Sequence, residues 1–166
     1  MAKLLSRLGV SVIETAPITN GKTDYFLVKS IASAVSGTVV SVPVDILDPE
    51  SPARSWDALK SAAKPRLQVA VPVSTVQMEY FCHKKPDGIL DLIARNVGAC
   101  AALCPEVEFV ADDFGRSDAS FLLKAIQTAL DNGAKVITVP DAAGNLLEDE
   151  FQALVAKVRA IVPEGV

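Results

Sequence analysis

Five short apolar segments, each followed by a stretch with helical spacing, recur along the whole chain. They are Val10–Glu14, Val39–Val44, Leu67–Val71, Val107–Val110 and Lys135–Val139. Strands that alternate with helices pair in parallel, because each helix returns the chain to the same end of the sheet. The pattern therefore predicts an α/β fold with about five parallel strands and covering helices, in a single domain over residues 1–166.

The segments between the strands predict six helices. The first covers Lys3–Leu8, and Thr23 or Asp24 is the expected cap of the second, which Gly37 ends. Its apolar positions recur at helical intervals: Phe26, Leu27, Ile31 and Ala34. The later helices are expected from a Ser55 cap to Ala63, from Pro86 to about Ala102, from a Ser117 or Asp118 cap to Asn132, and over Glu148–Ile161. The stretch from Val73 to Lys85 is predicted as an irregular loop.

Composition excludes several classes of protein. Half of the residues are hydrophobic and 22% are charged, which is typical of a folded domain and not of a disordered chain. The net charge of −4 argues against nucleic acid or an anionic membrane as a partner. With no apolar run of membrane-spanning length and no signal-peptide pattern, we expect a soluble, cytoplasmic protein.

The three cysteines, Cys82, Cys100 and Cys104, form an odd set without a CxxC pair. We interpret them as reduced structural thiols, since none has a histidine at a spacing suited to nucleophile activation. The one histidine, His83, lies beside two lysines in the predicted loop, where we expect it to be exposed.

The most informative stretch runs from Val107 to Asp118. An apolar strand delivers two adjacent carboxylates, Asp112 and Asp113, onto a loop that turns at Gly115 and leads into a helix. Such strand ends are where α/β proteins place their chemistry. Adjacent residues on an extended segment point in opposite directions, so at most one of the two carboxylates faces a site. In the same loop Arg116 either binds a ligand carboxylate through two hydrogen bonds or forms an ion pair with Asp113 or Asp141.

The sequence resembles the isopropylmalate synthase and homocitrate synthase family, relatives of hydroxymethylglutaryl-CoA lyase with a pyruvate carboxyltransferase domain. The matching residues are Leu8-Gly-Val-x-Val-Ile-Glu14, Lys64-Pro-Arg66 with Ser74 and Met78-Glu-Tyr80, Val107-Glu-Phe109, Asp113-x-Gly-Arg-Ser-Asp118, Gly133-Ala134, Ile137-x-Val-Pro-Asp141 with Gly144, and Glu148-x-Glu-x-Phe151. The resemblance implies a partial (β/α)8 TIM-type barrel and a Claisen condensation of acetyl-CoA with a 2-oxo acid.

The resemblance also implies a divalent metal, held in the family by an Asp in a D-x-x-L-R-D-G motif and a His-x-His pair. Neither motif is present here, and a single histidine cannot form the pair. We therefore expect no metal or other cofactor to be held by this chain alone, and a divalent metal only where a partner chain supplies ligands.

Other family positions are altered as well. The family's strand histidine falls at Gln68, which cannot act as an acid or base, and its glutamate falls at Asp112. A family serine falls at Val110 and a threonine at Ala142. Four family positions keep their polar residue: Glu14, Asp113, Arg116 and Asp141.

Three functional hypotheses remain open. The first is an incomplete homologue that binds a small carboxylate or acyl-CoA in a binding or regulatory role, with Arg116, Asp113, Asp141 and Gln68 as ligand-binding candidates. The second is one half of a split acyltransferase that a companion chain completes. The third is metal-free enolisation or carbon–carbon bond chemistry with Glu14 or Asp112 as the general base.

A partial barrel leaves two strand edges open, here the segments Val10–Glu14 and Lys135–Val139. Open edges are a liability that proteins pair or cover. We therefore expect a homo-oligomer or docking to a companion chain that supplies the rest of a barrel.

Overall fold

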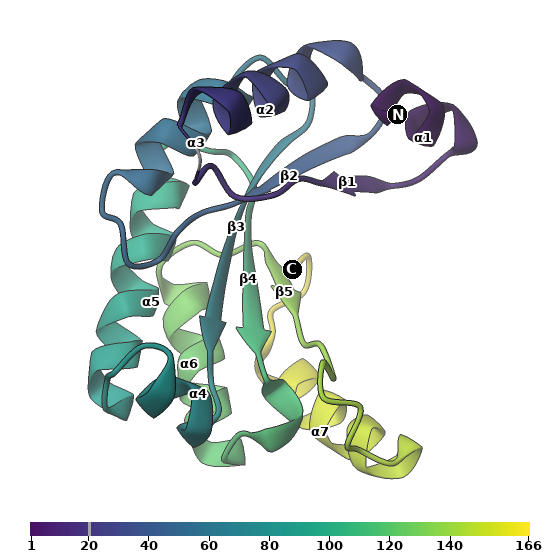
Figure 1. Cartoon of the computed structure of the whole chain (residues 1–166). Coiled ribbons are helices and arrows are strands. Elements are labelled where there is room, and N and C mark those ends of the chain that lie inside the picture. The colour runs from purple at the N-terminus through teal and green to yellow at the C-terminus, as the bar shows by residue number, and fades with distance from the viewer. Residues whose placement is uncertain (20) are drawn as a thin grey trace.

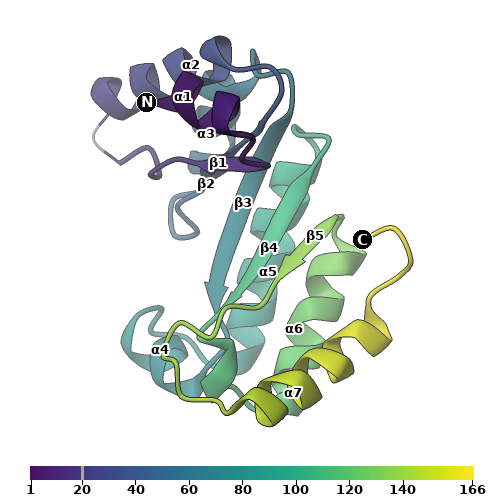
Figure 2. The same cartoon turned by 90° about the vertical axis from the view of Figure 1, so that its right-hand side faces the viewer.

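A five-stranded sheet is the centre of the computed structural model, which describes residues 1–19 and 21–166 (Figure 1). The strands are β1 (Val12–Glu14), β2 (Val39–Pro43), β3 (Pro65–Pro72), β4 (Val107–Asp112) and β5 (Val136–Thr138). Their spatial order follows the sequence, and all four neighbouring pairs are parallel. The sheet curls into part of a barrel, as Figures 1 and 2 show, which confirms the predicted fold class.

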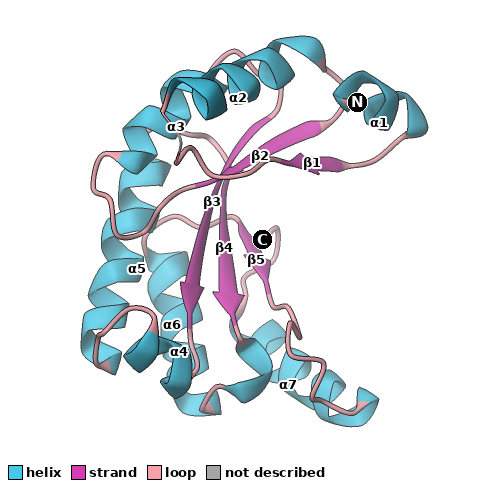
Figure 3. Cartoon of the chain, viewed as in Figure 1, coloured by secondary structure: helices cyan, strands magenta, loops and turns pink. Residues whose placement is uncertain are grey.

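Helices cover the convex side of the sheet and leave the concave side open (Figure 3). They are α1 (Ala2–Leu8), α2 (Lys22–Ala34), α3 (Ser51–Leu59), α4 (Thr75–Tyr80), α5 (Pro86–Ala101), α6 (Ala119–Asp131) and α7 (Glu148–Ile161), with a short 3₁₀ turn η1 (Phe114–Arg116). None of the helices in the described residues is long and apolar enough to cross a membrane.

Strand alternation separates the core from the candidate site. On β3 and β4 the paired residues Val69 and Phe109 are fully buried, as is Leu67. The adjacent pair, Gln68 and Glu108, points to the opposite, concave side because side chains alternate along a strand. The apolar core therefore lies between the sheet and the helices, and the polar strand residues line the concave face.

Several helix ends agree with the sequence signals. Pro86 occupies the first turn of α5, where its missing N–H costs nothing. The side chain of Asp118 caps α6 by accepting a hydrogen bond of 3.0 Å from the N–H of Phe121. The last helix has the predicted bounds, Glu148–Ile161.

Several local predictions were wrong. Helix α3 begins at Ser51, one turn before the expected cap Ser55, which is buried inside the helix. The stretch 73–85 is not wholly irregular, because Ser74 caps helix α4 by accepting from the N–H of Gln77. Strand β1 begins at Val12, two residues later than predicted.

The second helix also differs from the prediction. It begins after Gly21, so neither Thr23 nor Asp24 is its cap, and it ends at Ala34, three residues before Gly37. Asp24 accepts hydrogen bonds from Thr19, which belongs to the loop before the helix. That predicted loop, Thr15–Gly21, includes Asn20, which lies outside the described residues.

Helix α2 buries other residues than the four apolar positions noted in the sequence. Val28 and Ala32 are the residues that it buries. Phe26 and Leu27, two of the four apolar positions that recur at helical intervals, are 58% and 53% exposed. The helix therefore presents large apolar side chains away from the sheet.

We predict that shortening one convex-side residue of β3 destabilises the fold strongly. Leu67→Ala should lower the free energy of unfolding by about 2–5 kcal/mol, because Leu67 is fully buried between sheet and helices. Urea unfolding followed by circular dichroism measures this. Leu147→Ala is the matched control, since Leu147 is largely exposed, and it should change the free energy little. Equal effects of the two changes would contradict the assigned strand orientation.

Candidate functional site

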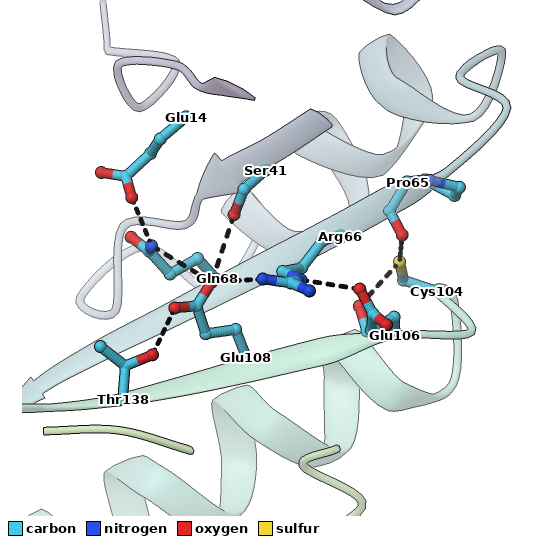
Figure 4. Close-up of polar contacts among 9 residues, drawn as sticks. All are labelled: Glu14, Ser41, Pro65, Arg66, Gln68, Cys104, Glu106, Glu108 and Thr138. Atoms are coloured by element: carbon cyan, nitrogen blue, oxygen red, sulfur yellow. Dashed lines mark hydrogen bonds and ion pairs between the residues drawn. The ribbon is translucent and has the colours of Figure 1, made fainter. Parts of the chain in front are cut away.

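A network of polar side chains crosses the concave face and draws on all five strands (Figure 4). Its members that lie on the strands are Glu14 of β1, Ser41 of β2, Arg66 and Gln68 of β3, Glu108 of β4 and Thr138 of β5. In a chain whose strands are otherwise apolar, these residues make the concave face polar. This face is the candidate functional site together with the loops at the carboxyl ends of the strands.

The carboxylate of Glu108 is the centre of the network. Glu108 is only 7% exposed, and Thr138 donates a hydrogen bond of 2.6 Å to its Oε1 atom. Its Oε2 atom lies 3.5 Å from Arg66 Nη1, and Ser41 Oγ and Gln68 Nε2 are at the same distance. A buried carboxylate requires such donors, because its desolvation is otherwise costly.

Gln68 joins the centre of the network to the first strand. Its Nε2 atom donates to Glu14 Oε2 at 2.8 Å and to Glu108 Oε2 at 3.5 Å. Both neighbours are carboxylates, so the amide nitrogen, which is the donor, is the end of the side chain that faces them. The sequence candidates Glu14 and Gln68 are thus in direct contact, although 54 residues separate them.

The guanidinium of Arg66 forms ion pairs with two carboxylates on this face. Arg66 Nε donates to Glu106 Oε1 at 2.7 Å, while Arg66 Nη1 faces Glu108. Beside this pair, the thiol of Cys104 donates a hydrogen bond that the carbonyls of Pro65 and Glu106 share. Arg66 therefore stabilises the face itself and is not free to bind an anionic ligand.

At the carboxyl end of β4 the two adjacent aspartates have different environments. Asp112 shares the concave side with Glu108 by strand alternation, and its Oδ1 atom accepts the N–H of Asp113 at 3.0 Å. Asp113 adopts a left-handed backbone conformation with φ of 59° and is 2% exposed. Only Asp112 of this pair remains available to a ligand.

Asp113 anchors the loops that follow β3 and β4. Its carboxylate accepts hydrogen bonds from the hydroxyl of Ser74 and, at 2.7 Å, from Arg116 Nε. Burial acts to raise the pKa of Asp113, but the hydrogen bonds from Arg116 and Ser74 outweigh it and lower the pKa. The ion pair expected for Arg116 is therefore present, while 45% of the Arg116 side chain stays exposed.

Asp141 anchors the loop after β5. Its two carboxylate oxygens accept the N–H groups of Asn145 at 3.4 Å and Leu146 at 3.3 Å. This loop packs against Gly115, where an added Cβ would lie 3.0 Å from Asp141 Oδ1. The glycine thus allows a close approach between the loops after β4 and β5.

Four residues of the network escaped the sequence analysis as site candidates: Ser41, Arg66, Glu108 and Thr138. The available signal was a charged residue in the middle of an apolar strand, as at Glu108 and Arg66, since such residues are rarely buried without partners. The cysteines fit the structural interpretation. All three are buried free thiols, and burial raises the pKa of Cys100 to about 12. His83 is exposed, as expected.

The carboxylates of the concave face are distributed over the sheet and are not gathered at one point. Within residues 1–19 and 21–166, no group of three or more His, Cys, Asp or Glu side chains converges so as to hold one. The carboxylates on the concave face are instead spaced by the donors Gln68 and Arg66.

Comparison with known proteins identifies the class. The HMGL-like family model matches residues 1–166, and the chain belongs to that family. It is 32% identical over 170 aligned residues to a 2-isopropylmalate synthase of Nitratidesulfovibrio vulgaris, covering 99% of this chain and 32% of that protein. A 2-isopropylmalate synthase of Shouchella clausii is 35% identical over 156 residues, covering 93% of this chain and 30% of that protein. The chain therefore spans about a third of the length of these relatives.

Solved structures share the fold. HMG-CoA lyase of Bacillus subtilis superposes with a TM-score of 0.69 at 14% identity, over 96% of this chain and 55% of that one. A phosphonopyruvate hydrolase gives a TM-score of 0.67 at 15% identity, over 98% of this chain and 61% of that one. At such identities the likeness concerns the fold alone.

We predict that the Asp113 anchor stabilises the protein in a pH-dependent way. Because its pKa is lowered in the folded state, the stabilisation is present above the unfolded-state pKa and is lost as the pH falls through the folded-state pKa. Asp113→Asn should lower the free energy of unfolding by about 1–3 kcal/mol at pH 7, because hydrogen bonds to a charged group are lost. Asparagine tolerates the left-handed conformation, so the backbone is not the cause.

Urea unfolding at pH 7, 5 and 3 measures this effect. The difference between Asp113→Asn and the unmodified protein should shrink towards pH 3. Asp131→Asn is the control, because Asp131 is exposed and belongs to no loop anchor. A difference that is constant with pH would show that the charge of Asp113 is not responsible.

Proposed function

We propose that this chain binds a small carboxylate such as a 2-oxo acid, or an acyl-CoA, and does not catalyse the Claisen condensation by itself. The observation that carries the absence of catalysis is the hydrogen bond from Gln68 to Glu14, and the one that carries ligand binding is the half-exposed Arg116 at the strand ends. In the bond to Gln68, the carboxylate of Glu14 is paired with an amide that can neither accept nor release a proton.

The interior of the barrel supports the absence of catalysis by this chain alone. Glu108 is held by donors from three other strands, and Arg66 is held by two carboxylates. Where the resemblance to the synthases implies a serine and a threonine, Val110 and Ala142 supply no hydroxyl. A divalent metal is proposed only in a complex with a companion chain that brings its own ligands.

The strand ends support ligand binding. Arg116 is the cation there, and Asp113 engages its Nε atom while nearly half of the side chain remains exposed. A guanidinium of this kind can bind a second carboxylate through its remaining N–H groups. Asp112 lies on the same loop and can accept a hydrogen bond from a hydroxyl of the ligand. Asp141 contributes by holding the neighbouring loop in place.

Two other functions, half of a split acyltransferase and a metal-free enzyme, are each favoured by one observation. The edges of the sheet, β1 and β5, leave room for a companion chain, which favours half of a split acyltransferase. Glu14 is exposed on the concave side, which favours metal-free enolisation with Glu14, or with Asp112, as the base. The three hypotheses differ in what the isolated chain does to a 2-oxo acid.

We predict binding without turnover. Titration calorimetry with pyruvate and 2-oxoisovalerate should show saturable binding, and Arg116→Ala should weaken it about tenfold or more, since a charge-assisted hydrogen bond is lost. Lys124→Ala, which removes an exposed cation of α6, is the matched control and should bind normally. Equal affinity of the Arg116→Ala and Lys124→Ala variants would show that Arg116 does not bind the ligand.

We further predict no catalysis by the isolated chain. Release of free CoA from acetyl-CoA with a 2-oxo acid and Mg²⁺ should stay at background, and deuterium exchange at the α-carbon of the 2-oxo acid should too. Exchange that Glu14→Gln or Asp112→Asn abolishes would establish the metal-free enzyme instead. CoA release that begins only when a second protein is added would establish the split acyltransferase.

A further inference from the structure

A cavity of about 460 Å³ lies between the N-terminal parts of helices α2 and α3. The two helices pack side by side (Figure 1). The cavity is lined by Gly21, Lys22, Tyr25 and Phe26 of the α2 segment and by Arg54 of α3. Its volume falls within the roughly 300–1,000 Å³ that small-molecule sites occupy. Both of its walls come from consecutive helices, so the cavity does not depend on the open edges of the sheet.

The aromatic wall of this cavity is fixed by neighbouring side chains. The hydroxyl of Tyr25 donates a hydrogen bond of 2.7 Å to Asp57 of α3, and the ammonium of Lys29 lies 5.5 Å from the centre of the Tyr25 ring. The ring of Phe26 meets that of Tyr25 edge-on, with centroids 5.5 Å apart and planes at 84°. Because Phe26 is nonetheless largely exposed, it offers a positioned ring face to a ligand.

The charged residues that line the cavity are both cations. Within residues 1–19 and 21–166, Lys22 forms no ion pair. Arg54 donates from Nη2 to Asp48 at 2.5 Å, which orients the guanidinium, and 35% of its side chain stays exposed. Asp48 itself lines the adjoining cavity, and Asp57 is paired with Lys60 at 2.6 Å. The cavity therefore joins an aromatic surface to positive charge.

We infer that this cavity binds a small molecule with an aromatic ring and an anionic group, either a carboxylate or a phosphate. The ring lies against Phe26, and the anionic group is bound by Lys22 and by the remaining N–H groups of Arg54. A protein partner would need a surface of roughly 800 Å² on this side, whereas the cavity has the size of a small-molecule site. It shares no lining residue with the proposed carboxylate site at Arg116, so its ligand is a second one.

Titration calorimetry with phenylacetate and with adenosine 5′-monophosphate tests the inference and distinguishes a carboxylate from a phosphate. At least one of the two should bind saturably, and Phe26→Ala should weaken that binding about fivefold or more, because contact with the ring is lost. Leu27→Ala is the matched control, since Leu27 is exposed on the same helix but does not line the cavity. Binding of neither compound, or equal affinity of the two variants, would overturn the inference.

Charge reversal at Lys22 tests the cationic part of the site. Lys22→Glu should weaken binding about tenfold or more, because attraction of the anionic group becomes repulsion. An acid in the first turn suits a helix, so this change should not unfold α2, which circular dichroism checks. Lys124→Ala, which removes an exposed cation of α6, should bind normally. Unchanged affinity of a folded Lys22→Glu variant would contradict the assignment.

Competition with pyruvate separates this cavity from the site at Arg116. Saturating pyruvate should leave the affinity for the aromatic anion unchanged, because the two sites have no residue in common. Displacement of the aromatic anion by pyruvate would place its binding at Arg116 and overturn the inference. Failure of pyruvate to bind would count against the proposed function only, and the Phe26 and Lys22 variants would still decide the role of this cavity.

Discussion

The buried carboxylate of Glu108 is the constraint on which the concave face depends. A carboxylate removed from water needs several hydrogen-bond donors, and here they come from three other strands: Ser41 of β2, Arg66 and Gln68 of β3, and Thr138 of β5. Because these donors lie on separate strands, this one side chain connects β2, β3 and β5 to β4. Gln68 also donates to Glu14, and Arg66 also donates to Glu106. These bonds add the first strand and the residue before β4 to the network.

Because the polar residues inside the partial barrel bond to one another, the candidate ligand-binding residues lie at its rim, the loops at the carboxyl ends of the strands. The groups in the middle of the strands hold one another, whereas the rim keeps an accessible acid, Asp112, and a half-exposed cation, Arg116. Asp113 makes this division possible, because it takes one nitrogen of Arg116 and the hydroxyl of Ser74 and so fixes both loops. This division between the interior and the strand ends is the basis of the proposal that the chain recognises a ligand there.

Sequence reasoning succeeded where the signal was local. The five strands, the proline at the start of α5 and the bounds of α7 follow from composition, caps and periodicity. It failed where distant residues decide. The exposed face of α2 depends on which residues its neighbours bury, and Ser55 lies inside α3 because the helix begins a turn earlier. In the site, the contact of Glu14 with Gln68 and the role of Glu108 depend on strand register, which one sequence does not reveal.

The proposed ligand site and the edge of the sheet meet at Glu14. This residue lies on the exposed edge strand β1, and its carboxylate is the outermost member of the Glu108 network. Any polypeptide that pairs with β1 would remove water from the neighbourhood of Glu14 and so strengthen its hydrogen bond with Gln68, because electrostatic interactions grow as the local dielectric falls. Any ligand that changes the position of Gln68 would then favour or oppose association, and by thermodynamic reciprocity association would change the affinity for that ligand by the same factor. The concave network thus provides a physical connection between the open edge of the sheet and the rim of the barrel.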